Sequence, residues 1–326
     1  MRAAICHQFG GPEVVSIEEI DRPIPKNNEV LIRVKATSVN RTDCGFRAGE
    51  PKFARIIMGL TKPRYPILGC EFAGDIVEIG AAVTEFNIGD KVFGYCEDNY
   101  NFGGHGEYKA MNLKGMLATI PEKLSYLDVV AACEGGHYAL HDLRCAKIGP
   151  GSRIVINGGT GGIGSAAIQL AKHMGAEIVA TCRKQHFDIV KNLGASRIID
   201  YESHDFTDVL RGEKFDAVFD AVGKSTFAKC KPLLVKGGRY ISTELGPKAE
   251  NPFLALWTKV FGDYRVLFPL PVMRQEDILY LRSLIVSGDY APLIDKTYPF
   301  EDVAAAHEYV ETGQKVGNVI IEYDVK

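Results

Sequence analysis

The sequence has few of the features that mark secreted, membrane-spanning or nucleic-acid-binding proteins. Its eight cysteines are scattered and form no C-x-x-C pair, so neither a structural zinc finger nor a redox dithiol is predicted. The net charge is only −3, and no basic run offers a surface to nucleic acid or anionic lipid. The N-terminus lacks a signal-peptide core, and no apolar run has the length of a membrane span. These absences predict a cytoplasmic protein with no nucleic-acid partner and no membrane span.

The most hydrophobic late segment, residues 251–272, is interrupted by Lys259, Asp263 and Arg265. These charges predict a core helix followed by a strand rather than a segment that crosses a bilayer. Residues 264–270 could form the edge strand of a sheet or a strand buried within one subunit.

The 326 residues suffice for two domains, and the pattern of predicted secondary structure differs between two parts of the chain. In the first third, residues 29–40, 72–80 and 90–95 are short β-rich segments separated by Gly-rich or Asn-rich breaks. This pattern predicts a compact, mostly antiparallel, barrel-like domain.

From about Leu124 the chain alternates between helices and strands. Strands are predicted at residues 152–158, 177–182, 196–200, 215–223 and 239–243. Helices are predicted at residues 125–147, 163–175, 186–194, 225–238, 276–288 and 301–313, with a last strand at 318–324. The alternation predicts right-handed βαβ units and a parallel sheet, hence an α/β fold. We expect a packed junction near residue 122.

A glycine-rich turn, residues 157–167, is the strongest motif. Gly159, Gly161 and Gly164 match G-x-G-x-x-G between an apolar strand and a helix, which is the context a dinucleotide-binding loop requires. Glycine permits the tight turn and the close approach of a pyrophosphate, and the helix start offers free N–H groups. A purely structural glycine turn is the alternative.

The second strand of this region ends at Arg183 and Lys184, where NAD-binding folds usually place a carboxylate. Two cations can pair with a 2′-phosphate, so the sequence favours NADPH over NADH. Either cation could instead simply face solvent.

Taken together, residues 158–176, 191–201 and 215–223 resemble the zinc-independent quinone oxidoreductase branch of the medium-chain dehydrogenase/reductase superfamily. The resemblance extends over nearly the whole chain, through residues 38–50, 69–80, 88–95 and 313–321. It implies a GroES-like β-barrel catalytic domain (residues 1–122 and 272–326) and a Rossmann doubly wound parallel-sheet domain (residues 123–271).

The resemblance also bears on metal binding. Zinc-dependent relatives have a cysteine where this chain has Asn40 and a histidine where it has Cys70, and their third ligand falls near residues 132–136. Asparagine is a poor zinc ligand. We therefore predict no metal and interpret Cys70 as a packed thiol, although a site built from Cys70, Glu71 and Cys133 or Cys44 stays open.

The resemblance implies roles for individual residues. Asn40 would donate a hydrogen bond to the substrate oxygen, or else merely cap a turn; Asp43 and Arg47 would brace the site. Tyr138 is a candidate proton donor among several side chains near the cleft. The implied cofactor-binding residues are Gly159, Gly161, Gly162, Ile163, Gly164, Arg183, Lys184, Tyr201, Ala221, Val222, Gly223 and Asn318. Tyr201 could equally be a half-buried strand-end aromatic.

The predicted function is NADPH-dependent hydride transfer to a quinone or an α,β-unsaturated carbonyl, without a metal. Two alternatives remain: a zinc alcohol dehydrogenase with atypical ligands, and a low-turnover protein that binds NADPH as a sensing ligand. Apolar residues Phe53, Ile56, Ile57 and Met58 suggest a hydrophobic acceptor, or belong to the core. The resemblance further implies a homodimer joined through the edge strands of the Rossmann sheets.

Overall fold

The computed structural model describes residues 1–95, 102–269, 272 and 274–324. The chain forms two compact units: residues 1–134 with 273–326, and residues 135–272. The change of unit falls after Glu134, whereas the sequence places the domain junction near residue 122. The assignment of these units as catalytic and cofactor domains stays a prediction.

The first unit contains a seven-stranded sheet. Its order is β14-β15-β3-β4-β5-β7, with β6 paired to β3. All pairs are antiparallel except β14 with β15, which confirms the mostly antiparallel prediction. The strands of this sheet are β3 (Glu29–Val39), β4 (Glu71–Ile79), β5 (Lys91–Tyr95), β6 (Tyr108–Asn112), β7 (Leu117–Thr119), β14 (Ile294–Pro299) and β15 (Asn318–Glu322). A separate hairpin pairs β1 (Arg2–Cys6) with β2 (Val15–Glu19).

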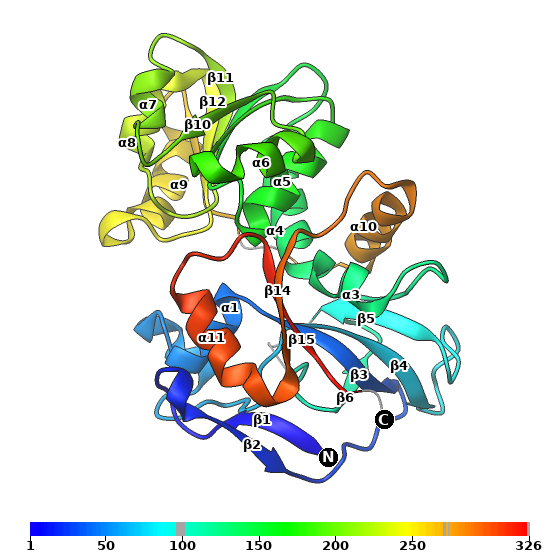
Figure 1. The fold of residues 1–326 in the computed structure, drawn as a ribbon. Coiled ribbons are helices and arrows are strands. Elements are labelled where there is room, and N and C mark those ends of the chain that lie inside the picture. The colour runs from blue at the N-terminus through cyan, green and yellow to red at the C-terminus, as the bar shows by residue number, and fades with distance from the viewer. Residues whose placement is uncertain (96–101, 270–271, 273, 325–326) are drawn as a thin grey trace. The chain divides into compact units, whose positions relative to one another are not determined.

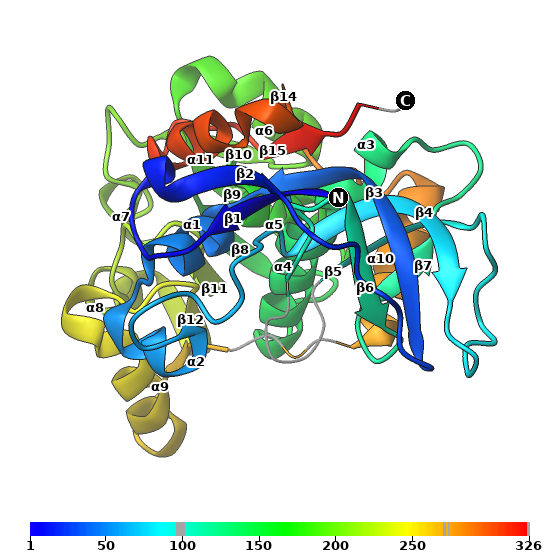
Figure 2. The ribbon, with the colours of Figure 1, turned by 90° about the horizontal axis from the view of Figure 1, so that it is seen from below.

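Both ends of the chain build this unit. Strand β15, near the C-terminus, pairs with β3 so that Val319 lies opposite Val39 (Figure 1). On its other side β3 pairs with β4 (Figure 2). The helices of this unit are α1 (Arg41–Ala48), α2 (Arg55–Met58), α3 (Tyr126–Val129), α10 (Gln275–Ser287) and α11 (Val303–Glu311). Helix α11 packs on the sheet and contributes to its apolar core through Val303, Ala306 and Val310.

The second unit is a six-stranded sheet in which every pair is parallel, as predicted. Its order is β10-β9-β8-β11-β12-β13, so the order reverses between β8 and β11. The strands are β8 (Arg153–Asn157), β9 (Glu177–Cys182), β10 (Arg197–Asp200), β11 (Phe215–Asp220), β12 (Leu234–Ser242) and β13 (Arg265–Leu267). In such sheets ligands bind at the carboxyl ends of the strands, beside the point of reversal.

The helices of the second unit follow its strands in alternation. They are α4 (Cys133–Cys145, beginning in the first unit), α5 (Gly162–His173), α6 (Phe187–Leu193), α7 (Phe206–Val209), α8 (Phe227–Cys230) and α9 (Glu250–Val260). Buried apolar residues between sheet and helices include Val155, Val218 and Leu233.

Three predicted elements differ from the structure. The helix expected at residues 125–147 breaks at Ala131, whose φ of −95° and ψ of 18° are not helical. The helix expected at 225–238 ends early, and strand β12 already begins at Leu234. Helix α9 is not a core helix, because Leu256 and Val260 are each 72% exposed.

Strand β13 covers residues 265–267 of the strand predicted at 264–270, and Leu270 lies outside the described residues. Within the part of the chain that the structure describes, no helix combines the length and apolarity needed to cross a membrane.

Candidate active site

Asn40 joins strand β3 to helix α1 and is the N-cap of that helix. Its side-chain oxygen accepts a hydrogen bond from the Asp43 amide at 3.0 Å, and the Asp43 carboxylate accepts one from the Asn40 amide at 3.1 Å. This reciprocal capping box satisfies two amides at the helix start. The structure therefore shows the turn-capping role that the sequence left as an alternative for Asn40.

The side-chain nitrogen of Asn40 contacts Cys70. Its Nδ2 donates to Cys70 Sγ over 2.9 Å, and both residues are buried. Asn40 and Cys70, the two positions on which the metal prediction depends, are thus neighbours in the structure. Among the described residues, no group of three or more His, Cys, Asp or Glu side chains has an arrangement that could hold a metal ion.

Asp43 is fully buried and organises the loop that carries Cys70. Its Oδ1 accepts from the amides of Gly69 at 3.0 Å and Cys70 at 3.2 Å, while its Oδ2 accepts from Asn40. Burial raises the pKa of Asp43 to about 7, although these three hydrogen bonds oppose the shift. This carboxyl is enclosed by backbone amides, and its role in bracing the site stays a prediction.

Two further carboxyls lie close by. Glu71 is fully buried, accepts from Ser38 Oγ at 2.5 Å, and accepts from the Glu134 amide at 2.9 Å. Burial, with the repulsion of Glu134, raises the pKa of Glu71 to about 8. Glu134 accepts from Thr42 Oγ1 at 2.5 Å, and burial raises its pKa to about 7. Sequence reasoning missed Glu134, which lies 92 residues from Thr42.

Replacing Glu71 by glutamine should make stability less dependent on pH. The folded protein holds the Glu71 proton up to about pH 8, whereas the unfolded chain releases it near the ordinary glutamate pKa of 4.5. The free energy of unfolding of the wild type therefore falls as pH rises through this window, by at most about 1.4 kcal/mol per unit from this group.

The comparison requires denaturant unfolding of both proteins between pH 5 and 9. We expect the advantage of Glu71→Gln over the wild type to grow up to about pH 8 and then level off. Parallel stability curves would show that the Glu71 carboxyl does not titrate in this window.

The glycine-rich loop leaves β8 at the point where the strand order reverses. Gly161 is the N-cap of α5 and provides no side-chain cap, so the first-turn amides of that helix are open to an anion. A Cβ at Gly161 would meet nothing nearer than the Gly158 carbonyl at 3.6 Å, whereas one at Gly164 would lie 2.1 Å from that same oxygen. The loop thus has open space at Gly161 and close backbone packing at Gly164, and this arrangement fits a dinucleotide pyrophosphate.

A buried polar network fixes this loop, and sequence reasoning did not find it. Asn157 donates to Asp220 at 2.9 Å and accepts from Thr181 Oγ1 at 2.7 Å. The Thr181 hydroxyl oxygen in turn accepts from the Gly158 amide at 3.0 Å. The network ties together the ends of β8, β9 and β11. Because the partners lie 23 to 63 residues apart, no local motif reveals them.

The two cations predicted to bind a 2′-phosphate follow β9. Arg183 Nε lies 2.9 Å from Glu202 Oε1, so that carboxylate would compete with any phosphate for this guanidinium. Lys184 is exposed, and Tyr201 beyond β10 is 48% exposed rather than enclosed in the sheet. No local pattern predicts the Arg183–Glu202 pair, since the two residues follow different strands.

The remaining predicted residues lie in different places. In the second unit, Val222 after β11 lies against Gly158, where a Cβ would come within 2.3 Å of its Cγ1, and Ala221 and Gly223 flank it. Tyr138 is half-buried on α4 beside His137. In the first unit, Asn318 begins β15, and both its amide N–H and its Nδ2 donate to the Leu293 carbonyl.

Phe53, Ile56 and Ile57 are exposed, whereas Met58 is buried, so only Met58 belongs to the core.

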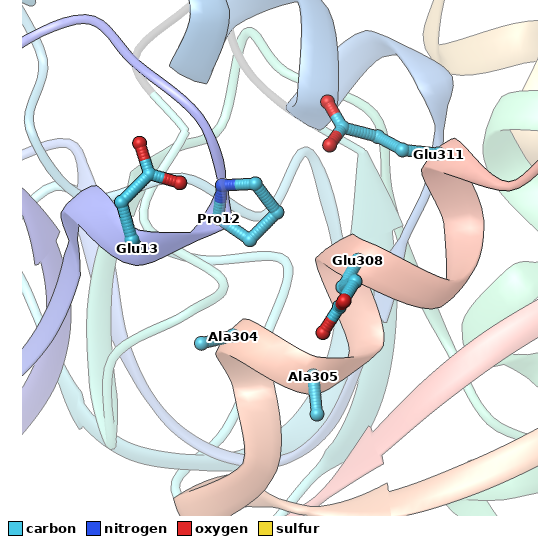
Figure 3. Close-up of a pocket in the computed structure, with 6 residues that line it drawn as sticks. All are labelled: Pro12, Glu13, Ala304, Ala305, Glu308 and Glu311. Atoms are coloured by element: carbon cyan, nitrogen blue, oxygen red, sulfur yellow. The ribbon is translucent and has the colours of Figure 1, made fainter.

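A hollow of about 450 Å³ lies between residues 12–13 and α11, with Glu13, Glu308 and Glu311 among its lining residues (Figure 3). Glu311 also pairs with the buried Arg47, which ties α11 to α1.

Comparison with known proteins identifies both parts of the chain. Residues 26–140 match the alcohol dehydrogenase GroES-like domain, and residues 193–321 match the zinc-binding dehydrogenase family. The chain is 30% identical to human quinone oxidoreductase, across 96% of this chain and 94% of that protein. It is 29% identical to the chloroplastic NADPH-dependent alkenal/one oxidoreductase of Arabidopsis thaliana, across 98% of this chain and 79% of that protein. The quinone oxidoreductase structure from Coxiella burnetii superposes with a TM-score of 0.89 at 29% identity, covering 100% of this chain and 99% of that one.

Proposed function

This chain belongs to the quinone oxidoreductase family of the medium-chain dehydrogenase/reductase superfamily, and we propose that it reduces quinones or α,β-unsaturated carbonyls with NADPH. The observation that carries the proposal is the uncapped start of α5 after Gly161, at the reversal of a parallel sheet. Two relatives are named for the reduction of quinones and of alkenals, and both kinds of acceptor are conjugated carbonyl compounds. These names support a conjugated carbonyl as the acceptor of this chain.

The second unit would hold the cofactor. The first-turn amides of Gly162 and Ile163 would bind the pyrophosphate, with Gly159 and Gly164 shaping the turn. Lys184 and Arg183 would pair with the 2′-phosphate, and Tyr201 would lie beside them. Arg183 would first have to break its ion pair with Glu202. Ala221, Val222 and Gly223 would contact the ribose or nicotinamide, and Asn318 would close over it. When bound, the dihydronicotinamide supplies the hydride.

The first unit would handle the charge that develops on the substrate. Hydride addition to a conjugated carbonyl places negative charge on oxygen, and a fixed hydrogen-bond donor stabilises it. Asn40 would be that donor, because its amide is held in place by the capping box and by Cys70. Asp43 would brace it, and Tyr138, which belongs to the second unit, would be a further donor. We propose that no catalytic metal is needed, since Asn40 replaces a cysteine ligand and already binds the Cys70 sulfur.

Steady-state oxidation of NADPH and of NADH, each with a simple quinone and with an alkenal, tests this function. We expect turnover with both acceptors and a kcat/KM at least about tenfold higher for NADPH, which corresponds to 1.4 kcal/mol. No turnover with either acceptor would contradict the reductase, and a preference for NADH would contradict the role of Lys184 and Arg183.

We also propose that the protein is a cytoplasmic homodimer that pairs through β13. This strand is last in the sheet order, and the neighbouring α9 exposes Phe253, Leu256 and Trp257. An unpaired strand edge beside an apolar helix face favours association with a second copy. Sedimentation velocity should give a dimer at micromolar concentration, and Leu256→Glu should shift it towards monomer. A wild type that sediments as a monomer would contradict this assembly, and recovery from the membrane fraction of cells would contradict the location.

A further inference from the structure

We propose that Glu202 sets how strictly the protein prefers NADPH over NADH, an inference that rests on the proposed function. In the free protein its carboxylate would hold the Arg183 guanidinium, which the 2′-phosphate of NADPH needs. When NADH binds, the same carboxylate would accept a hydrogen bond from the 2′-hydroxyl of the adenosine ribose. Glu202 would therefore oppose the binding of NADPH and favour that of NADH.

Glu202 and Arg183 are close together because strands β9 and β10 end side by side. In this parallel pair Asp200 lies opposite Cys182, and the Tyr201 amide donates to the Cys182 carbonyl over 3.4 Å. Arg183 directly follows β9, and Glu202 is the second residue after β10. Dinucleotide-binding folds place the adenosine ribose at this end of their second strand. We therefore expect both side chains at the position where NADPH and NADH differ.

The backbone that carries Glu202 is held by the side chain of Asp200. Asp200 Oδ1 accepts from the Glu202 amide at 3.1 Å, and Asp200 Oδ2 accepts from Ser203 Oγ at 2.7 Å. Such local hydrogen bonds from an aspartate stabilise a turn. Because Asp200 binds its own turn, Glu202 is the carboxylate that contacts Arg183.

The ion pair between Arg183 and Glu202 is easily broken. Arg183 Nε lies 2.9 Å from Glu202 Oε1, yet among the described residues this nitrogen has no partner with hydrogen-bond alignment. The two side chains are 35% and 55% exposed. An exposed ion pair without the two parallel N–H bonds of a guanidinium fork contributes little free energy. A 2′-phosphate can therefore displace the carboxylate, but part of its binding free energy is used to separate the pair.

The two cofactors would interact with this carboxylate in opposite ways. The 2′-phosphate of NADPH carries close to two negative charges, so it competes for Arg183 and is repelled by Glu202. The 2′-hydroxyl of NADH is a hydrogen-bond donor, and its usual partner in NAD-binding folds is a carboxylate at the end of the second strand. Strand β9 is followed by two cations, so Glu202 would supply this carboxylate from the end of the neighbouring β10.

Glu202→Gln tests the inference, because it removes the charge and keeps the size of the side chain. We expect the Kd of NADP⁺ to fall about tenfold and the Kd of NAD⁺ to rise about fivefold, so that selectivity for NADP⁺ rises about 50-fold. Calorimetric titration of both nucleotides measures these constants without turnover. With a quinone as acceptor, KM for NADPH should fall and KM for NADH should rise, while both kcat values stay within about twofold of the wild type.

Glu177→Gln is the matched control. Glu177 begins β9, at the opposite end of the strand, and its Oε2 lies 3.3 Å from Arg153 Nε. These two side chains are 36% and 53% exposed, almost as in the pair of Arg183 with Glu202. The control removes the same kind of ion pair at the end of the strand where no cofactor is expected, so both nucleotide affinities should stay within about twofold of the wild type.

A double-mutant cycle tests whether Glu202 opposes NADPH through Arg183. In the Arg183→Gln background, Glu202→Gln should improve NADP⁺ binding by less than about threefold, because no guanidinium is left to release. A gain of about tenfold in that background would mean that the ion pair has no part in the selectivity, and it would overturn the inference.

Other outcomes bear on the inference as follows. Unchanged selectivity in Glu202→Gln would refute it and leave the proposed function intact. A parallel change in the affinities for both nucleotides would show a structural role for Glu202 and would refute it as well. A wild type that binds neither nucleotide would refute the proposed function together with this inference.

Discussion

Gly161→Val should lose at least about 100-fold in NADPH affinity while its melting temperature stays within about 2 °C of the wild type. The backbone at Gly161 has a φ of −68° and a ψ of 164°, which any residue adopts. An added Cβ would meet only the Gly158 carbonyl, at an ordinary 3.6 Å. The fold can therefore accept the side chain, but its methyl groups would occupy the space in front of α5 that we assign to the pyrophosphate.

Gly164→Val is the matched variant, and we expect it to lower the melting temperature, unlike Gly161→Val. Its Cβ would lie 2.1 Å from the Gly158 carbonyl oxygen, a distance that no rotamer relieves, so the loop must deform and the melting temperature must fall. NADPH titration by fluorescence, with thermal unfolding of both variants, separates the two effects. Wild-type affinity in Gly161→Val would show that the pyrophosphate does not bind at this helix start.

Asp43→Ala should destabilise the protein by about 3–5 kcal/mol, the largest stability effect that we expect from a single side chain here. The change leaves the amides of Asn40, Gly69 and Cys70 without their acceptor in a fully buried place. It also removes half of the capping box that begins α1.

Asp43→Asn is the control for this prediction. The carbonyl oxygen of the new asparagine can still accept hydrogen bonds from the Gly69 and Cys70 amides. Its NH₂ group would face the Asn40 amide, which is also a donor, so only the hydrogen bond from Asn40 is lost. We therefore expect a smaller loss, of about 1–3 kcal/mol. Chemical denaturation measures both variants. A loss below about 1 kcal/mol in Asp43→Ala would show that the amides find other partners.

The sequence predicts the second unit well because its signals are local. The glycine turn between strand and helix, and the alternation of strands and helices, both arise from neighbouring residues, and the parallel sheet with its reversal beside Gly158 follows. The two wrong predictions in this unit also concern single elements, β12 and α9. Pro232 and the glycines after it obscured the start of β12 at Leu234, and the apolar residues of α9 suggested burial where the structure exposes them.

The candidate site was less predictable because its contacts join distant parts of the chain. Residue types alone could not tell whether Asn40 caps α1 or donates to another group, and the structure shows that it does both. Nothing local in the segment around Glu134 points to Thr42, and nothing at Arg183 points to Glu202. Such pairs depend on tertiary packing, which periodicity and motif spacing do not encode.

The most direct test of the central claim is a single turnover of chelator-treated, metal-analysed protein with NADPH deuterated at C4 and an alkenal. We predict that metal-free protein transfers the deuterium to the β-carbon of the product, because Asn40 and its neighbours need only to bind and stabilise the substrate oxygen. Transfer that fails without metal and returns when zinc is added would contradict the account and make Cys70 a ligand.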